Sequence, residues 1–168
     1  MASVVSGFIP AYGNEIGLDS LALDDGGICA LAFDGKINVN IVFREAQDQL
    51  FYVSRLGGLP AENPEEFYKN LLKANAFGSE TAGAAIGIDE GDGTVVLSYV
   101  LISSTLSYDL FKVTLGNFVD LAEVWINKLE GSDWSSDTFN SSGSGGTESR
   151  ISEPVGVTGL DPGQFIRI

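Results

Sequence analysis

The sequence contains no histidine and only one cysteine. Without histidine it lacks the commonest general base, the commonest zinc ligand and every Ser-His or Cys-His nucleophile pair. Cys29 has no second cysteine to pair with, so no disulfide can form within the chain, and a reducing, cytoplasmic location is expected. Catalysis by carboxylates or lysine stays open, but most classes of enzyme are disfavoured.

Positive charge is also scarce. Nine Lys and Arg residues stand against 23 Asp and Glu residues, which gives a formal net charge of −14. A field of that sign repels phosphate backbones and anionic lipid, so nucleic acid and membrane surfaces are disfavoured as partners. The charge either favours basic partners or serves only solubility.

Long apolar runs are absent as well. No run approaches the roughly 20 residues that span a bilayer, so no membrane insertion is expected. The N-terminal stretch has neither the basic region nor the long apolar region of a signal peptide, which predicts a mature N-terminus.

What is present is enough apolar material for one globular domain: 44% of 168 residues. The composition changes near residue 131, where Ser, Gly and Asp become frequent. We therefore predict a domain over residues 1–131, a Ser/Gly-rich linker over 132–150 and a C-terminal tail over 151–168. The tail is either disordered or folds back over the domain or a partner subunit.

The first expected element is a helix within residues 4–18, where apolar residues recur at helical spacing. Pro10 and Gly13 interrupt this pattern. Because proline fits only the first turn of a helix without loss, the helix is expected to start near Ile9 or to be kinked.

Three strands follow. Residues 28–43 alternate as a hairpin whose favoured two-residue turn is Asp34-Gly35, and residues 49–57 form the third strand. Asn63 and Pro64 then open a second helix as N-cap and first helical residue. A second hairpin turns at residues 90–93, and a long amphipathic helix closes the domain.

The order α-β-β-β-α-β-β-α predicts an α+β domain, with one twisted antiparallel sheet packed on helices. The stretch GSETAG at residues 78–83 has the spacing G-x-x-x-x-G of a phosphate-binding loop, so we first ask whether it lies in the structural context that such a loop needs. A P-loop follows a strand, opens a helix and carries Lys after its second glycine. Here Ala84 follows that glycine, a helix precedes and a strand comes after, so the stretch is predicted to be a turn.

Two acidic clusters, Asp24-Asp25 and residues 89–92, offer oxygen ligands for a divalent cation. Neither has the EF-hand spacing, and both lie at hairpin entries where Asp and Gly favour turns. Cys29 lies between apolar neighbours, as a core residue does. The sequence therefore predicts no catalytic, metal or cofactor site, although a carboxylate pair is not ruled out.

With its elements placed, the sequence resembles the small type III secretion chaperones of the Tir-chaperone class. The resemblance covers about residues 3–131 and rests on several motifs in order. These are LDDGGICALAFDGKINVNI (23–41), LGGLP (56–60), FYKNLLKANAF (67–77), TAGAAIGID (81–89) and FVDLAEVWINKL (118–129).

The resemblance implies a bacterial cytoplasmic homodimer that uses no cofactor and binds the N-terminal region of a secreted effector in extended form. It also implies a sheet whose first and fourth strands lie at the edges. Two sets of residues carry over from the family: effector-binding residues Phe8, Tyr12, Ile16, Ile28, Ala30 and Ala32, and dimer-interface residues Phe67, Leu71, Ala74, Ala84, Ile86 and Ile88.

Two alternatives remain at this point. One is a chaperone-like interaction domain that serves another regulatory partner. The other is a carboxylate-based or metal-dependent enzyme, which would need clustered acids with raised pKa values in a cleft. Pro10 and Gly13 depart from the continuous apolar stripe of the family's first helix, so the position of the effector groove stays open.

Overall fold

The computed structural model describes residues 4–60 and 63–131, so the predicted linker and tail lie outside the described residues. The predicted α+β class and element order are confirmed. The elements are α1 (Val4–Ile16), β1 (Ile28–Phe33), β2 (Ile37–Arg44), β3 (Gln49–Gly57), α2 (Pro64–Asn75), β4 (Ala85–Ile88), β5 (Val95–Ile102) and α3 (Tyr108–Glu130).

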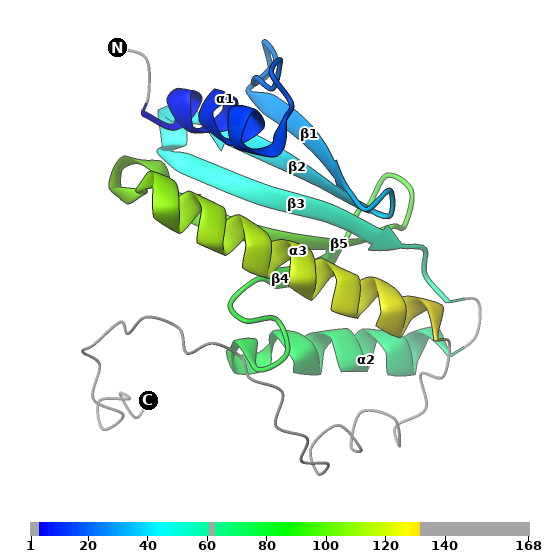
Figure 1. Cartoon of the computed structure of the whole chain (residues 1–168). Coiled ribbons are helices and arrows are strands. Elements are labelled where there is room, and N and C mark those ends of the chain that lie inside the picture. Colours follow the sequence, from blue (N-terminus) through cyan, green and yellow to red (C-terminus); the bar gives the residue numbers. More distant parts are fainter. Residues whose placement is uncertain (1–3, 61–62, 132–168) are drawn as a thin grey trace, which may run out of the picture.

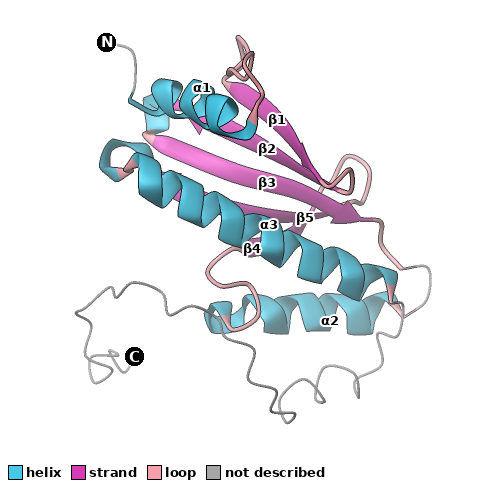
Figure 2. Ribbon diagram, in the orientation of Figure 1, coloured by secondary structure: helices cyan, strands magenta, loops and turns pink. Residues whose placement is uncertain are grey.

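The strands form one antiparallel sheet in the order β1-β2-β3-β5-β4, so β1 and β4 lie at its edges as the resemblance implied. Helices α1 and α3 lie over the same face of this sheet, and α2 lies beside β4 (Figure 1). Colouring by secondary structure shows the two layers (Figure 2). Within the described residues no helix covers the other face.

The core lies between α3 and the sheet. Along α3, Phe111, Leu115, Phe118 and Trp125 are buried at helical spacing, as the amphipathic pattern predicts. The hydroxyl of buried Tyr52 on β3 donates to the carbonyl oxygen of Phe111 at 3.0 Å. This bond joins residues 59 positions apart and satisfies a polar group that would otherwise be costly to bury.

Helix α1 corrects one expectation. It begins at Val4 and contains Pro10 in its interior, so the start predicted near Ile9 is wrong. Pro10 is exposed, so the Ser6 carbonyl that loses its helical donor lies on the same solvent side and water can satisfy it. Burial of Val5, Phe8 and Ile9 against the core stabilises the first turns despite the proline.

The turn stretches behave largely as predicted. Asp34 and Gly35 both have positive φ, 50° and 66°, as expected for a tight hairpin turn, but Phe33 pairs with Ile37, so the loop has three residues where two were predicted. Asn63 precedes Pro64 at the start of α2, although its side chain makes no capping bond. GSETAG is a turn between α2 and β4, with φ of 64° at Gly78 and 86° at Gly83.

Candidate interaction surfaces

The face of the sheet opposite the helices carries a row of apolar side chains that is partly exposed. Strand pairing aligns Ile28, Val42, Phe51 and Val100 in one row across β1, β2, β3 and β5. Ile28 is 37% exposed and Val100 49% exposed, while Val42 and Phe51 are half-buried. We call this row the open-face row. It gives an apolar partner a surface that the chain itself does not cover within its described residues.

The free edge of β1 offers backbone groups to a partner. The N–H of Ile28 donates to Asp24 Oδ1 at 2.8 Å, and the Ile28 carbonyl accepts from the Asp24 N–H at 2.8 Å, so these groups point away from β2. In an antiparallel strand every second residue points the same way, which places the N–H and C=O of Ala30 and Ala32 on this edge. An extended peptide can pair with such groups.

The free edge of β4 is closed by a side chain. Asn75, the last residue of α2, donates from Nδ2 to the Ile86 carbonyl and accepts the Ile86 N–H on Oδ1, both at 2.9 Å. Since Ile86 uses its outward groups here, β4 cannot extend the sheet at this residue. Of the two edges, β1 is therefore the open one.

The six residues predicted to bind an effector fall into separate places. Phe8 is buried against the rings of Tyr108 and Phe111, and Tyr12 is half-buried with its ring at 81° to that of Phe111. Ile16 is 43% exposed at the end of α1. On the other side of the sheet, the exposed side chains of β1 lie together, and they are Ile28, Ala30 and Ala32. The structure therefore divides the six residues: Phe8 and Tyr12 pack on the Phe111 ring, Ile16 lies apart, and the three β1 residues share the opposite face of the sheet.

The six residues predicted for a dimer interface are mostly used inside the chain. Ile88 is 41% exposed, but the other five are buried in the core; they are Phe67, Leu71, Ala74, Ala84 and Ile86. Burial leaves these five little surface for a partner in this conformation. The apolar side chains that α2 and the turn after it expose are Tyr68, Leu72 and Phe77.

A sequence signal for those exposed residues exists. Phe67, Leu71 and Ala74 follow the buried stripe of α2, whereas Tyr68 and Leu72 lie four residues apart beside it. An apolar pair off the buried stripe indicates a second contact surface.

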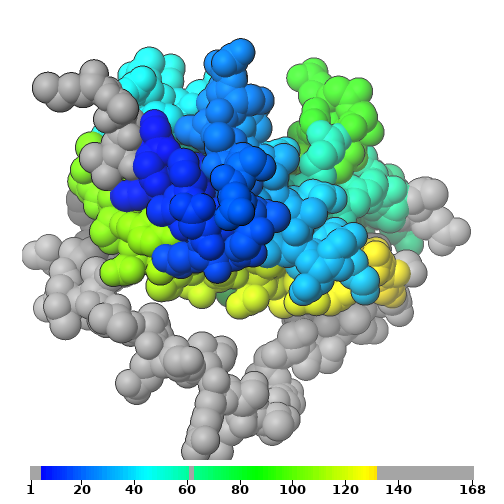
Figure 3. All heavy atoms as spheres, turned by 45° about the horizontal axis from the view of Figure 1, so that its top comes forward, coloured from blue at the N-terminus to red at the C-terminus, as the bar shows by residue number. Residues whose placement is uncertain are grey.

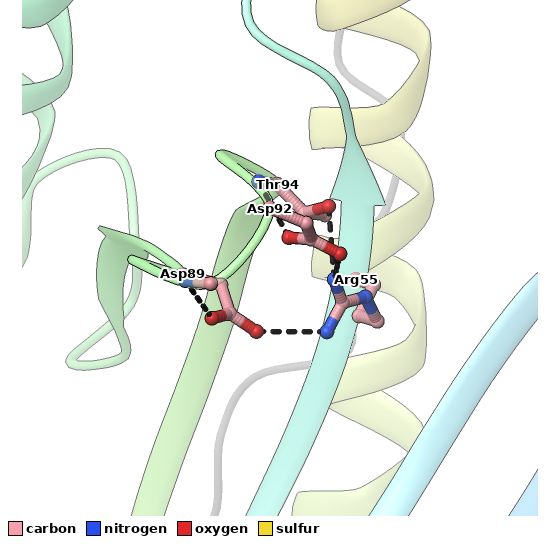
Figure 4. Close-up of polar contacts among 5 residues, drawn as sticks. Arg55, Asp89, Asp92 and Thr94 are labelled. Atoms are coloured by element: carbon pink, nitrogen blue, oxygen red, sulfur yellow. Dashed lines mark hydrogen bonds and ion pairs between the residues drawn. The ribbon is translucent and has the colours of Figure 1, made fainter.

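The acidic cluster after β4 is held by an arginine (Figure 4). Arg55 on β3 donates to Asp89 Oδ2 and to Thr94 Oγ1, each at 2.9 Å, and it also pairs with Asp92. Hydrogen bonds from the hydroxyl and the backbone N–H of Thr94 hold the pKa of Asp92 below its ordinary value, with Arg55 contributing. These carboxylates are engaged as turn and ion-pair partners, as the turn interpretation predicts.

The first acidic cluster, Asp24-Asp25, lines an open cavity on the surface. A cavity of about 510 Å³ lies between α1 and the start of β1, and Asp24, Asp25 and Glu45 are among its lining residues. In Figure 3 the loop before β1 and the green β4–β5 loop project from the molecule as separate points. Within residues 4–60 and 63–131, no three acidic or Cys side chains converge in a way that could hold a metal ion.

Cys29 is buried, and burial, with a smaller effect from Asp24, raises the pKa of its thiol. A thiol protonated in this way is a weak nucleophile. In the described ranges, no helix combines the length and the apolar character that crossing a bilayer needs.

Comparison with known proteins places this chain in a protein family. The model of the Tir chaperone protein (CesT) family matches residues 8–126. The transcriptional anti-antiactivator ExsC of Pseudomonas aeruginosa is 27% identical over 125 residues, which cover 74% of this chain and 85% of ExsC. A Chlamydia pneumoniae protein is 28% identical over 123 residues, which cover 72% of this chain and 92% of that protein.

Solved structures give the same fold. A chain of the crystal structure of the ExsC–ExsE complex has a TM-score of 0.65 and 26% identity, covering 73% of this chain and 91% of that chain. The Yersinia pestis type III secretion chaperone SycH, in complex with a fragment of YscM2, has a TM-score of 0.56 and 20% identity. That match covers 71% of this chain and 98% of the other. At this identity, the similarity to SycH shows only that the fold is shared.

Proposed function

Because the chain belongs to the Tir chaperone protein (CesT) family of type III secretion chaperones, we propose that it is a homodimeric chaperone in the bacterial cytoplasm that binds a secreted effector. It binds the N-terminal region of that effector in extended form and keeps it soluble for secretion. It acts by binding, without catalysis and without a cofactor. The family match over residues 8–126 is the observation that carries this proposal.

The open edge of β1 supports binding of an extended segment. Ala30 and Ala32 present backbone groups outward, and their side chains are too small to hinder a neighbouring strand. Beside this edge the open-face row can receive apolar side chains of the client, beginning with Ile28. Ile16 adds an exposed apolar group at the end of α1, whereas Phe8 and Tyr12 act by holding α1 on α3.

The surface around α2 and β4 supports the homodimer. Leu72 is 72% exposed and Phe77 fully exposed, while Tyr68 and Ile88 are each about 40% exposed. Exposed apolar side chains of this size on a small acidic protein favour a protein–protein contact. The buried residues Phe67, Leu71 and Ala74 would then orient this surface and not form it.

The test is co-expression with N-terminal fragments of secreted proteins from the same genome, followed by co-purification and light scattering. A 2:1 complex of chaperone and fragment is expected. Ala30→Pro removes an outward N–H of β1 and leaves the β1–β2 bonds in place, so it should weaken binding at least about tenfold. Ala30→Ser keeps the N–H and is the matched control. Equal binding by both variants would contradict strand addition at β1.

One observation favours a second candidate function. The similarity to ExsC, a transcriptional anti-antiactivator, agrees with a chaperone-like domain that binds a regulatory protein. Deleting the gene separates the two functions. Loss of one secreted protein with unchanged transcription of secretion genes supports the effector chaperone, whereas changed transcription of those genes supports the regulatory partner.

A further inference from the structure

Phe77 is the most exposed large apolar side chain among the described residues. Its relative exposure is 105%, and its backbone has φ 58° and ψ 13°. A bulky residue rarely adopts this left-handed conformation, and an exposed ring gains nothing to offset it. The chain thus holds an aromatic ring away from its own core, at the point where α2 ends.

A cavity that can receive a ring lies a few residues further along. It has a volume of about 100 Å³ and lies between the turn after α2, β5 and the middle of α3. Its lining combines Ala82, Ala84, the ring of Tyr99, Phe118 and Leu121 with the polar side chains of Thr81, Thr114 and Asn117. Apolar cavities of roughly 150 Å³ are known to take up a benzene ring, so the volume is of the right order.

The fully exposed residues of the segment between the ring and the cavity are small, whereas Glu80 in the same segment is half-buried and paired with Lys128. Ser79, Ala82 and Gly83 are exposed there, and a Cβ added to Gly83 would meet only the ring of Tyr99, at 3.7 Å. Small side chains let a second backbone come close. A two-fold axis through this turn would carry each Phe77 from its own subunit to the cavity of the other.

Charge agrees with a second copy of this chain as the occupant. Lys73 lies one helical turn before Phe77 and is exposed, and it makes no ion pair within residues 4–60 and 63–131. Asp120 is exposed on α3 beside the cavity residue Leu121 and is likewise without an ion pair in those ranges. A cation one turn before each Phe77 and an anion on the helix that lines the cavity are charges of opposite sign on two copies of this chain.

We propose that Phe77 of each subunit inserts into the cavity formed by residues 81–84, Tyr99 and α3 of the other subunit. This inference rests on the proposed homodimer and assigns the residue that locks it. The contact is reciprocal, so a dimer contains two such insertions.

The first test is Phe77→Ala in the full chain, with dissociation of the dimer measured by sedimentation. Because two buried aromatic contacts are lost, the dissociation constant should rise at least about a hundredfold. Val113→Ala is the matched control, since Val113 is a 60% exposed apolar residue on α3 outside the cavity. It should leave the constant within about threefold.

The second test is complementation. Asn117→Phe places a ring in the cavity from an exposed position of its own α3, so this variant should also dissociate. A mixture of the Phe77→Ala and Asn117→Phe chains restores one of the two insertions, and heterodimers should form more tightly than either homodimer.

The outcomes separate the two proposals. A monomeric wild-type chain overturns the proposed homodimer together with this contact. A wild-type dimer that Phe77→Ala leaves unchanged overturns the contact alone. Loss of effector binding by Phe77→Ala without loss of the dimer also overturns it, because Phe77 then contacts the client.

Discussion

Single polar side chains decide which edge of this sheet stays open. Asn75 takes both outward backbone groups of Ile86 on β4, and Asp24 takes the outward N–H of Ile28 on β1. Both are short side chains that hydrogen-bond backbone readily. The two side chains block different fractions of their strands. Asp24 closes one end of β1, whereas Asn75 acts in the middle of β4, which has only four residues.

Asn75→Ala should open the β4 edge. It removes two hydrogen bonds and leaves the Ile86 backbone without partners, which should cost about 1–3 kcal/mol of unfolding free energy in urea denaturation. Asn75→Asp keeps the acceptor but places a carboxylate oxygen against the Ile86 carbonyl oxygen, so it should destabilise the protein at least as much as Asn75→Ala. If both variants match the wild type, the amide does not hold the edge.

The hydroxyl of Tyr52 makes the free energy of unfolding depend on pH in the alkaline range. Burial is the main cause that raises the pKa of its hydroxyl above the ordinary value. In the unfolded chain this group ionises near pH 10, so its contribution is fully present below about pH 10. That contribution is lost as pH rises toward the raised pKa of the folded state, at up to about 1.4 kcal/mol per pH unit.

Tyr52→Phe should therefore lose about 1 kcal/mol at neutral pH, because the bond to the Phe111 carbonyl is gone. Above about pH 10 it should fall less steeply with pH than the wild type. Urea denaturation at several pH values from neutral to about pH 11 measures both effects. Parallel curves for the two proteins would show that Tyr52 ionises equally in the folded and unfolded states.

At the scale of elements, two glycines of α1 are expected to respond in opposite directions. A Cβ added to Gly7 meets nothing within 4 Å, so Gly7→Ala should raise the unfolding free energy by about 0.5–1 kcal/mol. A Cβ added to Gly13 would lie 2.5 Å from the Leu18 carbonyl oxygen, so Gly13→Ala should lower it by more than about 1 kcal/mol. Thermal unfolding of the pair measures this difference, and equal shifts would contradict the packing.

The same helix shows what the sequence could and could not predict. Alternation and turn residues were sufficient for the strands, because side chains on a strand alternate whatever packs on them. They were insufficient for α1, because the penalties of Pro10 and Gly13 are local while the burial that outweighs them comes from α3. A close fit of Gly13 against Leu18 has no signature in composition or period.

The candidate surfaces were predictable to a similar degree. The β1 set Ile28, Ala30 and Ala32 does share one exposed face, since strand alternation places them there. The α2 residues chosen for their apolar stripe are buried, because a helix stripe turns toward its own sheet before it turns toward any partner. The closure of β4 by Asn75 depends on where α2 packs, so the pattern of residues in the sequence could not predict it.

At the scale of the whole molecule, net charge opposes self-association. Each chain carries a formal charge of −14, so two subunits repel each other and salt screens that repulsion. We expect the proposed homodimer to tighten several-fold between about 20 mM and about 500 mM NaCl, measured by sedimentation. A dimer that weakens with salt would place ion pairs, not apolar contacts, at the centre of its interface.

The closure of Ile28 by Asp24 also limits the number of backbone hydrogen bonds that a client strand can form with β1. Only Ala30 and Ala32 remain to bond it, so at most four backbone hydrogen bonds are available on this edge. A one-residue slip turns the wrong backbone groups of the client toward this edge, whereas a two-residue slip brings the next client residues to the same four bonds. Backbone pairing would then align a client without selecting its sequence, and the choice among clients would fall to the side chains that follow along the open-face row.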